Sequence, residues 1–205
     1  MNSKTLCFAA LIAVVFVSAA IADQTVVLNF DDLPTQSYDF LPFNYGGLTW
    51  DNYHNLGYPL ESRTWCWKSE SADPPYSQPH SGDNYLFPGW GVNNLGFALP
   101  EARNQLAGAW FAKDHFEASG NVRFNGFDSA HHLIQQSNWL NVTDTPQYLA
   151  ADFSSVARIE VESQGVLFFT MDDLTYTVPE PGSMVLLLSC GACLFAFGWR
   201  KMKNG

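Results

Sequence analysis

Short runs in which apolar and polar residues alternate recur through the middle of this 205-residue chain. Residues 158–163 (RIEVES) give the clearest case, since Ile159 and Val161 share one face while charged residues occupy the other. Alternation with a period of two marks a strand that buries one face. Similar runs, beginning with 25–30 (TVVLNF), are separated by clusters of Gly, Pro, Asn, Asp and Ser. The pattern predicts an all-β domain over residues 23–177, an antiparallel β-sandwich that is jelly-roll-like.

The first 22 residues have the composition of a secretory signal peptide. Lys4 precedes an apolar stretch over residues 6–17, and small residues follow at 20–22 before the acidic Asp23. A basic start, an apolar centre and an A-x-A site are the three parts of such a signal, so we expect cleavage after Ala22. An uncleaved anchor is the alternative, although the apolar stretch is short for a span. The protein is therefore predicted to be exported.

A second uncharged apolar segment lies at the other end of the chain, over residues 184–199. Its 16 residues come close to the length of about 17–25 that spans a bilayer. Basic residues follow at once, which predicts a transmembrane helix with a cytoplasmic C-terminus and the domain outside. A soluble core helix is the alternative, but such a helix would be expected to carry a polar stripe.

Composition excludes some functions of the region between the two ends. Residues 23–178 hold 6 basic and 19 acidic residues, a formal charge of −13. A chain this acidic is poorly suited to nucleic acid, because binding there depends on Lys and Arg contacts to phosphate. Cys66 is the one cysteine of this region, so it can have no internal disulfide framework.

Two pairs of adjacent aspartates occur, one at the end of the first predicted strand and one within the last. Asp31 and Asp32 follow the first strand, and Asp172 and Asp173 lie within the last. The first and last strands of a sandwich are often neighbours, so the four carboxylates could meet and hold a structural Ca²⁺. In an alternating strand only one member of each pair points to the site, which favours Asp31 and Asp172 as ligands. The alternative is that these acids cap turns through backbone hydrogen bonds.

The sequences around these pairs also resemble a known group of domains. The start F-D-D-L and the finish F-T-M-D-D-L-T-Y are similar to the ends of secreted β-sandwiches such as MAM domains and jelly-roll carbohydrate-binding modules. The resemblance implies the sandwich fold, and it implies a structural calcium to which an aspartate of the last strand contributes. The cysteines usual in MAM domains are missing.

Aromatic residues are the second candidate feature. Trp65 and Trp67 lie on the same side of an extended segment, while Tyr76, Trp90 and Trp139 lie in or beside turn-like segments. Exposed aromatic rings stack sugar rings in binding modules, so we expect Trp65, Trp67, Tyr76 and Trp90 to contribute to a polysaccharide site. Core packing is the alternative for each tryptophan, since a sandwich also fills its interior with such residues.

Catalytic motifs are not evident. The chain has no G-x-S-x-G elbow, and its acids show no spacing that identifies an acid–base pair. The adjacent His131 and His132 would point to opposite faces of a strand, which disfavours a shared zinc ion. The sequence favours a non-enzymatic binding protein, with an extracellular hydrolase or lyase, or a purely structural matrix protein, as alternatives.

The C-terminal segment 178–205 resembles the PEP-CTERM sorting signal of Gram-negative bacteria. The triplet Pro179, Glu180 and Pro181 leads directly into the apolar segment, and Arg200 and Lys201 begin the basic end. The resemblance implies processing by an exosortase near the triplet, a transient membrane anchor, and delivery to the cell surface or an exopolysaccharide matrix. The prolines fit this role, because they keep the junction extended.

Overall fold

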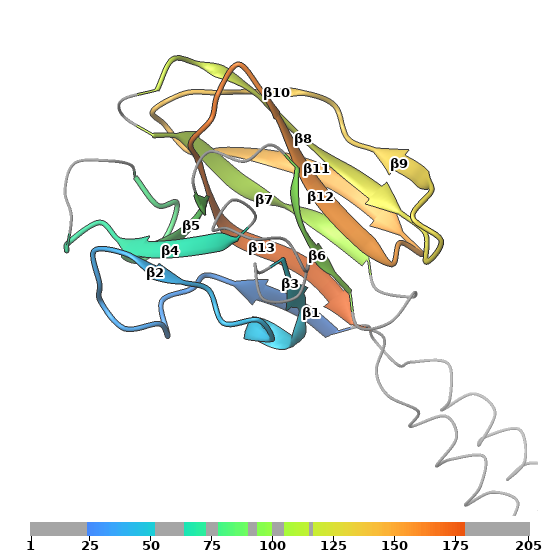
Figure 1. The fold of residues 1–205 in the computed structure, drawn as a ribbon, viewed down its shortest axis with the longest axis horizontal. Coiled ribbons are helices and arrows are strands. Elements are labelled where there is room, and N and C mark those ends of the chain that lie inside the picture. The colour runs from blue at the N-terminus through green and yellow to red at the C-terminus, as the bar shows by residue number, and fades with distance from the viewer. Residues whose placement is uncertain are drawn as a thin grey trace, which may run out of the picture. The chain divides into compact units, whose positions relative to one another are not determined.

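The computed structural model describes residues 24–51, 64–72, 78–89, 94–99, 105–114 and 117–178. Within these residues the chain forms two antiparallel β-sheets that pack face to face (Figure 1), as the alternation predicted. The elements are the short 3₁₀ helix η1 (Tyr45–Gly47) and the strands β1 (Gln24–Leu28), β2 (Asp39–Phe40), β3 (Thr49–Trp50), β4 (Trp65–Ser69), β5 (Asn84–Pro88), β6 (Leu95–Ala98), β7 (Gln105–Lys113), β8 (Gly120–Phe127), β9 (Leu133–Gln136), β10 (Leu140–Val142), β11 (Gln147–Ser154), β12 (Arg158–Gln164) and β13 (Phe169–Val178).

The strands divide into two sheets that we call sheet A and sheet B. Among the described residues, sheet A has seven strands in the order β11-β7-β13-β5-β4-β2, with β1 also paired to β13. In the same part of the chain, sheet B has six strands in the order β10-β8-β12-β6-β3, with β9 also paired to β8. The first and last strands are therefore neighbours, as predicted, and this pairing brings the two aspartate pairs into one region of the molecule.

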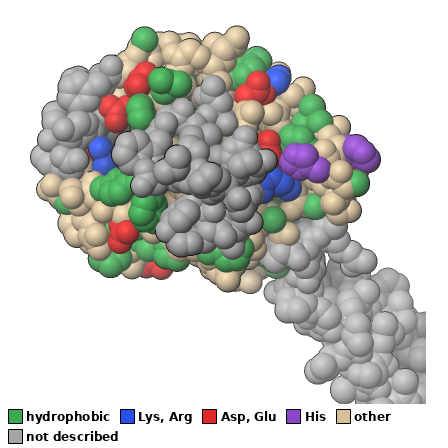
Figure 2. Space-filling view, viewed as in Figure 1, with side chains coloured by type: hydrophobic (Ala, Val, Ile, Leu, Met, Phe, Trp, Pro, Cys, Tyr) green, Lys and Arg blue, Asp and Glu red, His purple; other side chains and the backbone are tan. Residues whose placement is uncertain are grey.

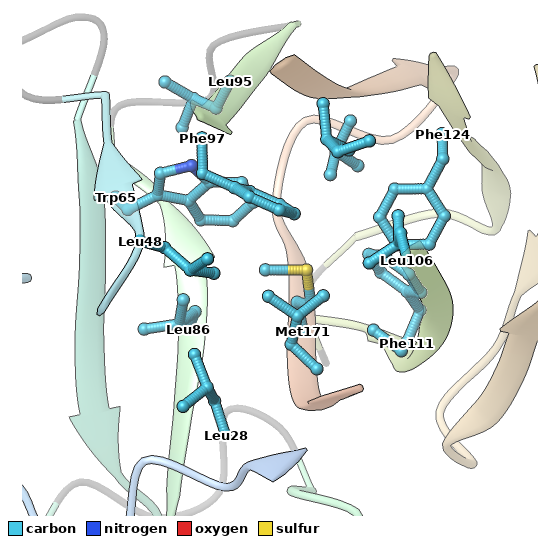
Figure 3. Close-up of a cluster of buried hydrophobic side chains, with 14 of the residues drawn as sticks. Leu28, Leu48, Trp65, Leu86, Leu95, Phe97, Leu106, Phe111, Phe124 and Met171 are labelled. Atoms are coloured by element: carbon cyan, nitrogen blue, oxygen red, sulfur yellow. The ribbon is translucent and has the colours of Figure 1, made fainter. Parts of the chain in front are cut away.

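The core lies between the inner faces of the two sheets. Ile159 and Val161 of β12 are completely buried there, which confirms the face that alternation assigned to them. Phe111 of β7 and Phe124 of β8 meet across the two sheets with ring centroids 5.4 Å apart. Figure 3 shows Met171 of β13 among these buried side chains. The aromatic content of the chain is thus used in large part for packing.

Trp65 and Trp67 belong to this core, so the prediction that they form an exposed platform is wrong. Their exposed fractions are 0% and 2%, because both point inward from β4, a strand flanked by β2 and β5. The indole N–H of Trp65 crosses to sheet B and donates to the Gly96 carbonyl at 3.0 Å. An aromatic ring with no exposed face cannot stack on a sugar, so the core-packing alternative holds for both residues.

Several predicted features lie outside the described residues. They are the signal peptide, the apolar segment 184–199 with the rest of the sorting signal, and the two aromatic residues Tyr76 and Trp90. The compact unit that contains the sandwich runs from Thr25 to Val178. Within the described ranges, no helix has the length and apolar character needed to cross a membrane.

Candidate functional site

Three of the four predicted aspartates, Asp31, Asp172 and Asp173, contact the loop that leads into β5. Asp31 accepts hydrogen bonds through Oδ1 from the backbone N–H groups of Asp83 and Asn84, at 2.8 and 3.1 Å. Asp172 accepts through Oδ2 from the backbone N–H of Ser81 at 2.8 Å. An aspartate after the first strand and one within the last strand thus hold the same loop, residues 80–84, which we call the carboxylate-held loop.

Both members of the second pair contact this loop, contrary to the expectation that only one would point to it. Asp173 accepts from the Ser81 hydroxyl at 2.9 Å, and its other oxygen lies 2.5 Å from Nδ1 of His80. The reason is a register irregularity in β13 after Asp172, where Asp173 has a left-handed φ of 47°. A bulge of this kind interrupts the alternation and re-aims a side chain.

The first pair is divided between two partners. Asp31 binds the carboxylate-held loop, while Asp32 accepts a hydrogen bond from the Tyr45 hydroxyl. Burial raises the pKa of Tyr45, and the hydrogen bond to Asp32 raises it further. The hydroxyl therefore stays protonated and remains a donor to this carboxylate.

These contacts decide how far the cluster fits a metal ion. The oxygens of Asp31 and Asp172 that face the loop already accept backbone N–H groups, which is the turn-capping alternative. Within the described ranges, no group of three His, Cys, Asp or Glu side chains is arranged to hold a metal. The present hydrogen bonds do not fit Ca²⁺, whose ligand oxygens must turn toward the ion, so structural calcium stays a prediction from the sequence.

The protonation state of Asp172 provides a test of the calcium prediction, because an aspartate that binds calcium has to be an ionised carboxylate. Burial raises the pKa of its carboxyl group to about 7, and the charge of Asp173 adds to the increase, while the N–H groups that it accepts lower it. In an unfolded chain an aspartate has a pKa of about 3.9. Between about pH 4 and pH 7 the folded state therefore binds a proton that the unfolded state has released, and this term of the unfolding free energy decreases as the pH rises.

We expect the melting temperature in EGTA to decrease from pH 5 to pH 7.5 by more in the native chain than in an Asp172→Asn variant. Bound calcium would require the carboxylate and would reverse this difference, because the ion would stabilise the native chain most at the higher pH. Melting curves with EGTA and with CaCl₂, together with metal analysis, separate the two cases. An unchanged melting temperature and no bound metal would contradict the calcium prediction.

A different cluster covers the outer face of sheet B. Side chains that alternate with the core residues of β8 and β12 point away from the sandwich, and those of β9 and β10 continue the surface. Most are amides or ion-paired groups. We call this set the polar face, and its members are Asn121, Arg123, Asn125, Gln136, Trp139, Asn141, Arg158, Glu160 and Glu162.

Hydrogen bonds tie the polar face together across three strands. Glu162 accepts from Nε of Arg123 at 2.7 Å and from the amide of Asn125 at 2.9 Å. Asn125 in turn accepts from the amide of Gln136 at 2.8 Å. Burial disfavours the charge of Glu162, but these donors outweigh it and hold its pKa below the usual range. Most of these groups are fixed before any ligand arrives.

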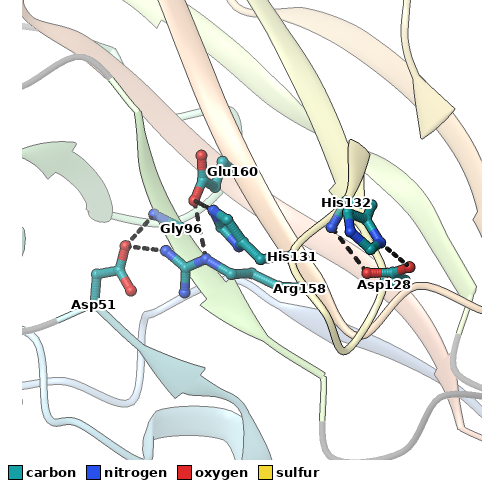
Figure 4. A network of polar contacts seen from close by, with 7 residues as sticks. All are labelled: Asp51, Gly96, Asp128, His131, His132, Arg158 and Glu160. Carbon is teal, nitrogen blue, oxygen red and sulfur yellow. Dashed lines mark hydrogen bonds and ion pairs between the residues drawn. The ribbon is translucent and has the colours of Figure 1, made fainter. Parts of the chain in front are cut away.

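A second ion pair marks the other end of the polar face. Arg158 donates to Asp51 at 2.6 Å and to Glu160 at 3.0 Å (Figure 4). Asp51 is 7% exposed and also accepts the backbone N–H of Gly96. Nε2 of His131 lies 3.8 Å from Glu160, at the margin of this network. The carboxylate of Asp51 is thus compensated within the fold, as a buried charge requires.

Aromatic rings lie beside the polar groups. The guanidinium of Arg123 lies 4.3 Å from the ring centroid of Trp139, and that indole is 40% exposed. The imidazole of His131 stacks on Phe127 with centroids 4.6 Å apart. Figure 2 shows histidine side chains beside acidic and basic ones at one margin of the molecule. The polar face therefore combines an exposed, fixed indole with ordered hydrogen-bonding groups.

Sequence reasoning identified Trp139 as a turn aromatic but not the polar face. The available signal was the recurrence of Asn, Gln, Arg and Glu at the outward positions of two adjacent strands. Polar residues at such positions are also what an ordinary solvated sheet face requires, so the pattern alone does not indicate a site.

No family model matches this chain, and no curated protein matches it either. Similar solved structures include a DUF4465 family protein from Bacteroides caccae, with 13% identity, a TM-score of 0.47, and coverage of 75% of this chain and 98% of that chain. The CBM22-1 xylan-binding domain of Xyn10C from Paenibacillus barcinonensis has 15% identity, a TM-score of 0.44, and coverage of 80% and 100%. At such values, function has to be argued from the side chains of this chain.

Proposed function

We propose that this chain is an exported polysaccharide-binding protein and that the polar face of sheet B holds the sugar chain. The observation that carries the proposal is the exposed indole of Trp139, fixed over Arg123 beside a network of amides and carboxylates. Pyranose rings present apolar C–H faces and a rim of hydroxyls. An indole packs against the former, while amide and carboxylate groups bind the latter.

The fixed conformations of the side chains on the polar face support sugar binding over sugar hydrolysis. Its side chains are held by one another, so little rotamer freedom remains to be lost when a ligand binds. A glycosidase needs a carboxyl group with a raised pKa as its general acid. On the polar face the pKa of Glu162 is instead lowered, and Glu160 is paired with Arg158. The carboxyl group with a raised pKa, that of Asp172, belongs to β13 of the other sheet.

Sorting by the C-terminal segment is the second part of the proposal. A PEP-CTERM signal processed by an exosortase would release the domain from a transient membrane anchor to the cell surface or matrix, where polysaccharide is present. The mass of the surface-extracted protein tests this part, since cleavage near Pro179–Pro181 removes the segment 184–199.

We expect a Trp139→Ala variant to bind polysaccharide at the polar face about tenfold more weakly, because it loses the stacking surface, and tenfold corresponds to about 1.4 kcal/mol. Native gels that contain xylan, galactan, mannan or hydroxyethylcellulose measure the retardation. A Leu167→Ala variant is the control, since Leu167 is 51% exposed and lies outside the polar face. Equal retardation of the Trp139→Ala and native chains, or no retardation of the native chain by any of the four, would contradict the proposal.

A further inference from the structure

Sheet A carries an aromatic group on its own outer face, at the edge formed by β11 and β7. Tyr148 and Trp110 are cross-strand partners in this pair of strands, and both alternate with core residues, so both point outward. Their ring centroids are 5.7 Å apart. Tyr148 is 41% exposed, which is about the exposure of Trp139 on the other sheet.

The ring of Tyr148 lies across the neighbouring strand. A Cβ atom at Gly108 of β7 would lie 2.7 Å from the Tyr148 hydroxyl oxygen and 2.8 Å from its Cζ. Glycine at position 108 therefore leaves the space that the tip of the ring occupies. The ring in this position is 41% exposed, and sugar stacking requires an exposed aromatic ring.

Trp110 is held by a second ring, that of His80. The imidazole of His80 stacks on its indole with centroids 3.5 Å apart and an interplanar angle of 9°. Nδ1 of His80 is held in turn by Asp173 at 2.5 Å. The carboxylate-held loop thus orders Trp110, and Gly108 makes room for Tyr148. Tyr148 is the exposed member of this pair.

We propose that Tyr148, with Trp110 beside it, is a second polysaccharide-binding site, so that one chain binds two sugar chains and cross-links them. This inference rests on the proposed function, because it assigns the same class of ligand to a second surface. The ligand is the apolar face of a pyranose in a neutral polysaccharide. Asp152, whose charge acts on the Tyr148 hydroxyl, is an acceptor for sugar hydroxyls nearby.

The position of the two sites leads to cross-linking. The core separates the inner faces of the sheets, so the polar face and the Tyr148 site lie on opposite outer surfaces of the sandwich. Packed sheets are about 10 Å apart. A straight polysaccharide segment on one surface cannot reach the other, and the two sites therefore engage different segments or different chains. Linking of this kind gains avidity without new contacts.

Turbidity and gel retardation together test the second site. We expect the full chain in mild detergent to raise the turbidity of one neutral polysaccharide that retards it, with a maximum at intermediate protein concentration. The Tyr148→Ala and Trp139→Ala variants should each raise the turbidity at least tenfold less than the native chain does. Each variant should still be partly retarded in the gel. The double variant should lose both. A Tyr38→Ala variant is the matched control, since Tyr38 is 42% exposed near the other edge of sheet A.

The outcomes separate the two proposals. If the Tyr148→Ala variant causes the same turbidity as the native chain, the proposal of a second site is wrong, while the proposal for the polar face stands. Self-association of the protein would then be the cause of cross-linking. Loss of all retardation in the Tyr148→Ala variant, with native retardation in the Trp139→Ala variant, would overturn the polar face as a site. A native chain that shows retardation without turbidity would overturn bivalence, and one without retardation would overturn both proposals.

Discussion

Replacing Trp65 with alanine is expected to lower the free energy of unfolding by about 3–5 kcal/mol, the usual range for a buried tryptophan. The ring is completely buried and contacts Trp50 and Phe169 edge-on, with centroids 5.9 and 6.2 Å away. Its indole N–H also joins β4 of sheet A to β6 of sheet B through the Gly96 carbonyl. The substitution therefore opens a cavity and removes a bond between the two sheets.

Urea unfolding of the full chain measures this loss, with a lower midpoint and an unchanged slope as the expected signature. Trp65→Phe keeps most of the volume but not the N–H donor, so its loss should be smaller. Trp139→Ala is the matched control, because that indole is 40% exposed and its removal should cost less than about 1 kcal/mol. A Trp65→Ala chain of native stability with impaired sugar binding would restore the rejected platform.

The contrast between these tryptophans shows what the sequence could predict. Alternation places Trp65 and Trp67 on one face of a strand, and the structure confirms that they share a face. Alternation alone does not say which face is buried, because the opposite face mixes the apolar Cys66 with the polar Thr64 and Lys68. Residues 158–163 give that reference, since charged residues mark their outer side, and there the predicted core face was correct.

The aspartate pairs also show which features the sequence can predict and which depend on tertiary contacts. Adjacency of the first and last strands follows from a general tendency of sandwiches, and it led to the expectation that the aspartates would converge. Asp31 and Asp172 do converge, on one loop that the sequence did not indicate. The bulge that also turns Asp173 toward this loop depends on a left-handed backbone angle at a non-glycine residue. Such an angle is sustained by tertiary contacts, here those of Asp173 with His80 and Ser81. A local sequence pattern therefore does not predict it.

The carboxylate-held loop depends on a glycine at its centre. Gly82 has a φ of +56°, and a Cβ atom there would overlap the Asp31 carboxylate. That carboxylate cannot turn away without giving up the N–H groups of Asp83 and Asn84. The left-handed angle costs an alanine about 1–2 kcal/mol, and each lost hydrogen bond about 0.5–1.5 kcal/mol. We expect Gly82→Ala to lower the free energy of unfolding by about 3 kcal/mol.

A double-mutant cycle with Asp31→Ala isolates the overlap from the backbone strain. In the Asp31→Ala background the carboxylate is absent, so Gly82→Ala should cost only the strain of about 1–2 kcal/mol. The coupling between the two positions should therefore be about 1–2 kcal/mol, measured by urea unfolding in EGTA. Additive losses would show that Asp31 does not hold the loop as described. A coupling that grows when CaCl₂ replaces EGTA would instead show that Asp31 binds calcium, because the ion would add a second dependence on its position.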